Sequence, residues 1–180
     1  MATIITHPVI PLALGMGQKI IPMRAILAGV FLSVAPDLDV ISFRLGIPYS
    51  HMLGHRGLSH SLIFAVFLAC ILTLTLRVGK DSRKAVFFLL LLSAASHGLL
   101  DAMTNGGLGI AFFAPFSNTR YFLPWQILQV SPIGVERFLT PRGLSVLYSE
   151  LVWVWIPVIC AAGLIYMARW WRFSNERNSN

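Results

Sequence analysis

The sequence predicts an all-α, polytopic membrane protein with about five membrane segments and an outer loop region that contains short interfacial helices. Of its 180 residues, 56% are hydrophobic and only 12% are charged, whereas a soluble domain carries about 25% charged residues. The apolar residues are also concentrated into runs, as membrane-spanning helices require. Together these observations favour an integral membrane protein over a soluble domain.

The apolar residues form five segments of unequal length. The first, Ile4–Met16, contains two prolines, and the second, Met23–Ala35, runs into Pro36. Both are too short to cross the hydrocarbon layer, so we expect a tight helical pair that ends below one membrane surface. The last segment reaches the roughly 20 residues that span a bilayer unaided. The third, fourth and fifth segments are Ser61–Val78, Ala85–Leu100 and Leu151–Trp171.

Basic residues at the segment ends predict the orientation, because cytoplasmic loops carry an excess of Lys and Arg. Alternating crossings place nine of them on one side, and assigning that side to the cytoplasm puts the N-terminus outside and the C-terminus inside. The net charge of +7 therefore needs no nucleic-acid partner, since membrane insertion and anionic lipid account for it. The nine residues are Lys19, Arg24, Arg77, Lys80, Arg83, Lys84, Arg169, Arg172 and Arg177.

The chain is predicted to form one membrane-embedded domain, residues 1–173, followed by a disordered cytoplasmic tail, residues 174–180. The tail sequence is SNERNSN, which is polar throughout. Between the fourth and fifth apolar segments, Asp101–Glu150 is rich in Gly, Pro and aromatic residues. This composition predicts an ordered outer loop with short interfacial helices.

In this topology, ionisable residues from four separate segments converge on the outer side. Such groups at membrane depth are costly and are usually functional. Each of them alone has an ordinary structural interpretation, and His51 is expected at the surface, but their convergence predicts metal binding. The candidate ligands are His7, Asp37, Asp39, His55, His60, His97 and Asp101.

The spacing of the candidates supports a shared site. His97 and Asp101 are four residues apart and share one helix face. His55 and His60 lie in GHRGLSHS, where two glycines predict a bent loop with Ser59 as the N-cap of the next helix. Imidazole and carboxylate without thiolate suit Zn²⁺ or Mn²⁺, and also Fe²⁺. Because seven candidates exceed the three or four ligands of one catalytic zinc, the count favours two divalent ions bridged by an acidic residue.

A two-metal site of this kind clamps the attacking and leaving oxygens of a phosphoester. We therefore expect hydrolysis of a phosphoester in a membrane lipid or lipid-linked substrate at the outer face. Asp39 is predicted to orient or deprotonate the attacking water. Arg56 is predicted to act in catalysis and, with Arg120, to bind the substrate phosphate, because arginine holds anionic oxygens in a forked geometry.

At these residues the sequence resembles the YdjM-like family of bacterial inner-membrane metal-dependent hydrolases, with the greatest similarity to its YbcI-type members. The family pattern of an early His, PD-x-D, H-R-G-x-x-H-S and H-x-x-x-D is matched throughout. The resemblance extends from residue 3 to about residue 170 and implies a multi-pass location in the bacterial inner membrane, with the outer side facing the periplasm. The stretches that carry it are ITHPVIPLALG, APDLDVISFRLGI, GHRGLSHS, SHGLLDAMTNGGLGIAFFAPFS and RYFLPWQ.

Two alternatives use the same ligands. A divalent-metal transporter would need a polar path to the cytoplasmic side, and SLIFAVFLACILTLTL offers only small hydroxyls beyond its start. A non-catalytic membrane protein would use a metal or salt-bridge cluster to hold its helices together. A bis-histidine haem site is a more remote alternative, because the neighbouring carboxylates suit hard ions better. None of these patterns bears on the oligomeric state.

Overall fold

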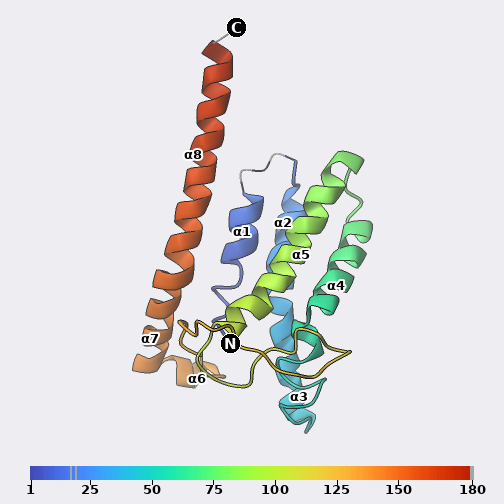
Figure 1. Ribbon diagram of the computed structural model, residues 1–180, viewed down its shortest axis with the longest axis vertical. Coiled ribbons are helices and arrows are strands. Elements are labelled where there is room, and N and C mark those ends of the chain that lie inside the picture. The colour runs from blue at the N-terminus through green and yellow to red at the C-terminus, as the bar shows by residue number, and fades with distance from the viewer. Residues whose placement is uncertain (17, 19, 179–180) are drawn as a thin grey trace.

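The computed structural model describes residues 1–16, 18 and 20–178 and is built from helices (Figure 1). Within these residues there is no strand, and β-type pairing is limited to two isolated bridges. The all-α prediction is therefore confirmed. In chain order the elements are α1 (Val9–Gly15), α2 (Met23–Val34), η1 (Ala35–Val40), α3 (Ile41–Arg44), η2 (Leu58–His60), α4 (Leu62–Thr75), α5 (Lys80–Ala102), α6 (Val135–Phe138), α7 (Pro141–Glu150), η3 (Leu151–Trp155) and α8 (Ile156–Asn178).

Three helical stretches in the described part of the chain are long and apolar enough to cross a membrane: Met23–Arg44, Lys80–Ala102 and Pro141–Arg172. In contrast, α1 has 7 residues and α4 has 14. At 1.5 Å per residue they rise about 10 and 21 Å, which is less than the roughly 30 Å of a hydrocarbon core. The predicted count of about five membrane segments is therefore higher than the structure shows.

The second apolar segment continues past Pro36, where the sequence predicts its end. Pro36 lies in the first turn of the 3₁₀ segment η1, and the helical stretch runs on to Arg44. Proline disrupts a helix interior because it lacks an N–H and clashes with the preceding turn, but the first turn of a new helical segment accepts it. Pro36 therefore changes the geometry of the helix without ending it.

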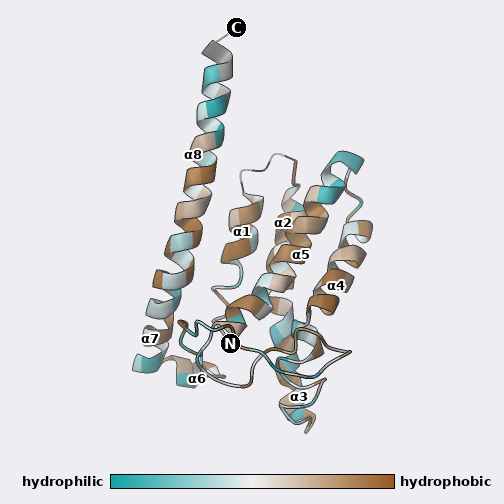
Figure 2. Ribbon diagram, in the orientation of Figure 1, coloured by the Kyte–Doolittle hydropathy of each residue, from teal (hydrophilic) through white to brown (hydrophobic). Residues whose placement is uncertain are grey.

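The core lies between α2, α4 and α5, which run side by side in Figure 1 and are brown over much of their length in Figure 2. Gly29 of α2 allows this close approach. A Cβ atom there would lie 2.9 Å from Ser93 Oγ of α5 and 3.3 Å from Pro11 Cβ of α1. The buried core residues are small or aliphatic: Ala25, Ile26, Leu32, Ala65, Ala69, Val78, Val86, Leu89, Leu90 and Ala94.

Helix α8 stands apart from this core. The most apolar window of Pro141–Arg172 is 6% buried, compared with 56% for α5, so most of this surface is left to face lipid. The N-terminus lies near the loops and the C-terminus at the opposite end of the molecule (Figure 1). The side of the membrane that each faces stays a prediction.

Two sequence predictions fall at or beyond the limits of the described residues. Helix α8 continues to Asn178, into the segment 174–180 for which the sequence predicts a disordered tail. Residues 179 and 180 lie outside the described residues, as does Lys19 of the predicted cytoplasmic set. The division into residues 1–173 and 174–180 stays a prediction.

Residues 103–134 form a loop that, together with α6 and α7, closes the end of the bundle at which α5 ends. Leu123 N donates to Ala102 O at 2.9 Å, and Leu128 N donates to Met103 O at 3.1 Å. These bonds tie the loop to the last turn of α5. The predicted loop region with short helices is thus confirmed, and it lies directly beside His97 and Asp101; its location on the outer side stays a prediction.

We predict that Gly29→Leu destabilises the protein, because the added side chain has to push α2 away from Ser93. Overpacking of this kind costs about 1–3 kcal/mol, which lowers the thermal midpoint by about 2–4 °C per kcal/mol in a chain of this size. Tryptophan fluorescence in detergent measures the midpoint. Gly163→Leu is the matched control, because a Cβ atom on Gly163 meets nothing within 4 Å. Equal midpoints for the two variants would contradict the close packing.

Candidate metal centre

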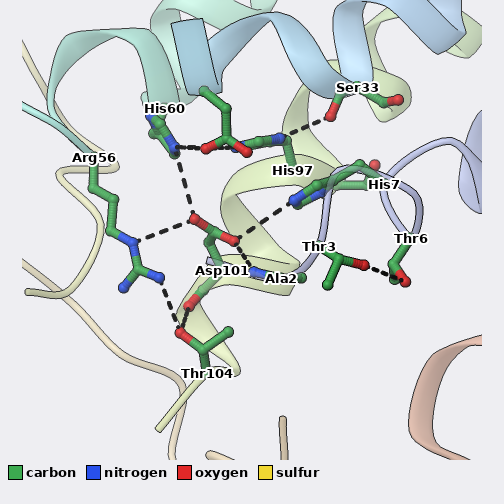
Figure 3. A network of polar contacts seen from close by, with 12 residues as sticks. Ala2, Thr3, Thr6, His7, Ser33, Arg56, His60, His97, Asp101 and Thr104 are labelled. Atoms are coloured by element: carbon green, nitrogen blue, oxygen red, sulfur yellow. Dashed lines mark hydrogen bonds and ion pairs between the residues drawn. The ribbon is translucent and has the colours of Figure 1, made fainter. Parts of the chain in front are cut away.

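Four of the predicted ligands meet where α5, η1 and η2 converge (Figure 3). Asp37 comes from η1, His60 from η2, and His97 and Asp101 from the end of α5. One potential ligand atom of each lies within 4.8 Å of the others. All four residues are buried, and the most exposed of them, Asp37, is 7% accessible.

The distances within this group fit a single tetrahedral ion. His60 Nε2 and His97 Nε2 lie 3.0 Å apart. Asp37 Oδ1 lies 3.4 Å from His97 Nε2 and 3.7 Å from His60 Nε2, and Asp101 Oδ2 lies 3.8 Å from His60 Nε2. Two ligands that are each about 2.0–2.1 Å from a tetrahedral zinc ion lie about 3.4 Å apart. The donor set and its spacing therefore suit a divalent transition metal.

Hydrogen bonds turn the Nε2 lone pairs of both imidazoles toward this point. His97 Nδ1 lies 2.7 Å from the carbonyl oxygen of Ser33 (Figure 3), so Nδ1 carries the proton and donates it. His60 Nδ1 lies 3.1 Å from Asp39 Oδ2 and is oriented in the same way. Metal-binding histidines are typically held through their second ring nitrogen like this. Two lone pairs that face each other at 3.0 Å repel unless a proton or a metal ion lies between them.

Pro36 explains why the Ser33 carbonyl is free to accept this bond. In a 3₁₀ turn that carbonyl would accept from the N–H of residue 36, and proline has no N–H. Pro36, in the first turn of η1, therefore leaves this acceptor to His97.

Asp39 and His55 lie behind His60, on the side away from the other three ligands. The Asp39 carboxylate accepts from Ser59 Oγ at 2.5 Å and from Arg56 N at 3.1 Å. It also lies 2.6 Å from His55 Nδ1. Asp39, His55 and His60 thus form an adjoining group of potential ligands that shares His60 with the first. Because these bonds occupy both oxygens of Asp39, the geometry favours a role in orienting His60, and the predicted role in activating water stays a prediction.

The loop GHRGLSHS is bent as predicted, but Ser59 does not cap the next helix. Ser61 is the N-cap of α4, since its Oγ accepts from Phe64 N at 3.1 Å. Gly57 is needed for the bend, because a Cβ atom there would lie 2.0 Å from Met52 O. Because Ser61 caps α4, the Ser59 hydroxyl is free to donate to Asp39.

His7 lies against the centre from the N-terminal segment. Its ring stacks on that of His97 with the centroids 3.9 Å apart, and its Nε2 lies 3.7 Å from Asp101 Oδ1. Burial is the main reason why the pKa of His7 is lowered to about 3, so the ring is neutral. Neither of its nitrogens has a hydrogen-bond partner among the described residues, and the same holds for both Asp37 oxygens and Asp101 Oδ2. Because buried polar atoms are nearly always hydrogen-bonded, these atoms point to a ligand.

Two carboxylates set the charge state of His60. Burial lowers its pKa, but the contacts with Asp37 and Asp39 outweigh burial and raise the pKa to about 9. His60 is thus placed where a positive charge is stabilised, and a metal ion that bound there would displace a proton.

Through its side chain, Arg56 binds other groups of the protein, mainly backbone carbonyl oxygens. It is fully buried, with φ of 62°. Its Nη1 donates to the carbonyl oxygens of Gly106 and Leu108, both at 3.0 Å. Its Nη2 donates to Thr104 Oγ1 at 3.1 Å, and its Nε lies 3.3 Å from Asp101 Oδ2. The guanidinium therefore neutralises Asp101 and holds the loop after α5.

Arg120 holds a neighbouring loop in a similar manner. Its Nη1 donates to His55 O at 3.1 Å. Its Nη2 donates to Tyr49 O at 3.2 Å and to His51 O at 2.9 Å. His51 itself is exposed, as expected. The phosphate-binding roles predicted for Arg56 and Arg120 gain no support from these contacts and stay predictions.

Sequence reasoning missed Glu150, which is 1% exposed and accepts hydrogen bonds from Thr3 and Thr6 of the segment that carries His7. A single carboxylate at the edge of an apolar segment forms no spacing pattern. The position of Glu150 next to the apolar run Leu151–Trp171 is the one sequence feature that could have marked it.

Comparison with known proteins places this chain among inner membrane proteins. The family model described as "YdjM inner membrane protein" matches residues 1–172. The protein "Inner membrane protein YbcI" of Escherichia coli (strain K12) is 42% identical over 180 residues, covering 96% of this chain and 99% of that protein. No solved structure matches the chain.

We predict that Arg56→Ala strongly destabilises the protein. The substitution removes the guanidinium beside buried Asp101, and the loss of one partner of a buried ion pair typically costs about 3–5 kcal/mol. Thermal unfolding in detergent measures the effect, with Arg44→Ala, an exposed arginine, as the control. A midpoint for Arg56→Ala equal to that of the control would show that the guanidinium is not needed to hold Asp101.

Proposed function

Since the chain belongs to the YdjM inner membrane protein family, we propose that it is a metal-dependent hydrolase of the inner membrane that cleaves a phosphoester of a lipid or lipid-linked molecule. The observation that carries the proposal is the pair of Nε2 atoms of His60 and His97, which lie 3.0 Å apart. Buried carboxylate oxygens that have no hydrogen-bond partner among the described residues surround them. We place this centre at the periplasmic face, in line with the orientation that the basic residues predict.

The charges of the centre suit a divalent cation. Asp37, Asp39 and Asp101 bring three carboxylates, and among the described side chains Arg56 is the only Lys or Arg within 4.0 Å of them. Counting these side chains alone, and with neutral imidazoles, two negative charges are in excess, which one divalent ion would balance. Zn²⁺ or Mn²⁺ suits imidazole and carboxylate ligands, and Asp37, His60, His97 and Asp101 would hold it. Such an ion would polarise the phosphoryl oxygen and lower the pKa of water to near neutrality.

We assign Asp101 and His7 to the side of the centre where water would attack. Asp101 Oδ2 faces His60, whereas Oδ1 lies 3.7 Å from His7 Nε2 and accepts from Ala2 N at 2.7 Å. The two oxygens therefore face different nitrogens, as a carboxylate that bridges two ions would. Neutral His7 is placed to bind the second ion or to hold a water molecule by a hydrogen bond.

An apolar groove between α1 and α8 supports a lipid as the substrate. Its volume is about 840 Å³. It begins at Ile5 and Pro8, the neighbours of His7, and extends along both helices to Arg169. Because its inner end adjoins the segment that carries His7, an acyl chain in the groove would keep its headgroup near the centre.

A divalent-metal transporter fits the structure less well. From the centre toward the other end of the bundle, the space between α2, α4 and α5 is filled by the apolar core. An ion on that path would meet aliphatic side chains such as Leu89 and Leu90, which supply no ligands.

A structural metal site is the second candidate. The burial of all four ligands favours it, because structural zinc sites are closed whereas catalytic sites keep an open position. Turnover separates the two candidates, since a structural ion would stabilise the helices without any hydrolysis.

We predict that the detergent-purified protein contains one to two transition-metal ions per chain and that both His60→Ala and Asp101→Ala lose them. Elemental mass spectrometry measures the content, with His51→Ala, an exposed histidine, as the control that retains the wild-type amount. A wild-type protein that stays free of metal after incubation with zinc and manganese would remove the basis of the hydrolase.

We predict that Gly163→Trp fills the groove and slows hydrolysis of a diacyl phospholipid at least about tenfold, equivalent to about 1.4 kcal/mol. Hydrolysis of a small water-soluble aryl phosphodiester should stay unchanged, because the centre itself is untouched. Ala161→Trp, exposed on the same helix and outside the groove, is the control. Equal loss on both substrates, or in both variants, would argue against an acyl chain in this groove.

A further inference from the structure

Glu150 is a buried carboxylate that the proposed chemistry does not use. It ends α7, and the π-helical segment η3 follows directly. Its Oε1 accepts from Thr3 N at 2.5 Å, and its Oε2 accepts from Thr3 Oγ1 at 2.5 Å and from Thr6 Oγ1 at 2.7 Å. No Lys, Arg or His in the described part of the chain lies within ion-pair distance of it, so its close partners are hydrogen-bond donors.

The donors to Glu150 all belong to the segment that reaches the metal centre. Three residues of this segment, Ala2, Thr3 and Thr6, are labelled with His7 in Figure 3. Ala2 N donates to Asp101 Oδ1 at 2.7 Å. At the other end of the segment, His7 stacks on His97. The same short stretch is thus bound to Glu150 in its middle and to the centre at both ends.

A hydrogen bond from Trp155 determines which group donates in the contact between Thr6 and Glu150. Trp155 Nε1 donates to Thr6 Oγ1 at 2.8 Å. Because an indole N–H can only donate, the Thr6 hydroxyl accepts from Trp155 and is left to donate its own proton to Glu150. The carboxylate is therefore matched to the hydroxyl. Because the Thr3 and Thr6 hydroxyls lie 3.2 Å apart and can pair with each other, an apolar side chain at residue 150 would leave the Thr3 amide and one hydroxyl proton unpaired in a buried place.

From these contacts we propose that Glu150 is a positioning residue of the metal centre. It fixes the segment Ala2–His7, so that the Ala2 amide orients Asp101 and the His7 ring stays against His97. The inference rests on the proposed function for its metal. Glu150 also links α8, whose surface is mostly exposed, to the centre through α7 and η3.

The test compares Glu150→Gln and Glu150→Ala with Ser149→Ala. Ser149 is a suitable control, because it is a neighbouring buried residue of α7 whose Oγ donates to Val146 O and accepts from Gln129 N, away from the segment Ala2–His7. We expect both Glu150 variants to raise the zinc dissociation constant about 10- to 100-fold, the usual effect of losing a group that orients ligands. Ser149→Ala should stay close to wild type. Cobalt added in place of zinc should also show a changed d–d spectrum in the Glu150 variants alone.

Zinc binding by Glu150→Gln that equals binding by Ser149→Ala would overturn the proposal. A wild-type protein that binds no zinc would instead refute the metal site. In that case hydrogen exchange tests whether Glu150 holds the segment Ala2–His7. Faster exchange of the Thr3 amide and its neighbours in Glu150→Gln than in Ser149→Ala would support this role. Equal exchange in the two variants would overturn it.

Discussion

The structure depends on two imidazole nitrogens that face each other in its interior. His60 and His97 present Nε2 atoms 3.0 Å apart, and each ring is held through its other nitrogen, one by Asp39 and one by the Ser33 carbonyl. Neither ring can turn away without breaking a buried hydrogen bond, at a cost of about 1–3 kcal/mol. A cation between them would convert their repulsion into attraction, and it would thereby link η2 to the end of α5.

Burying this much charge constrains the backbone around it. Arg56 adopts a φ of 62°, a left-handed conformation that costs a non-glycine residue about 1–3 kcal/mol, and this brings its guanidinium to Asp101. Gly98 of α5 is needed for a related reason, because a Cβ atom there would lie 2.9 Å from His60 O. Both features allow the loop that carries His60 to pack directly against α5.

The residues of the candidate site could be predicted from the sequence, whereas their grouping could not. His97 and Asp101 share a helix face through their spacing alone, and that expectation holds. The position of Asp39 behind His60 depends on the bend of an irregular loop, which no periodicity encodes. Arg56 illustrates the same limit, because its partners are mainly backbone carbonyls. Every residue type carries a backbone carbonyl, so the sequence cannot show which ones bind Arg56. Pro36 was expected to end a helix, since only the three-dimensional path distinguishes a helix end from the first turn of a 3₁₀ continuation.

The number of unpartnered atoms favours a catalytic ion over a structural one. A closed tetrahedral ion would bind one atom each of Asp37, His60, His97 and Asp101 and would leave both nitrogens of His7 without a partner in the described structure. Buried groups left in that state cost about 1–3 kcal/mol each, so a purely structural site would be more stable with an apolar residue in place of His7. A water molecule, a second ion or a substrate oxygen beside Asp101 Oδ1 would satisfy His7 Nε2. A reacting group would therefore bind on the side of the centre that the N-terminal segment closes.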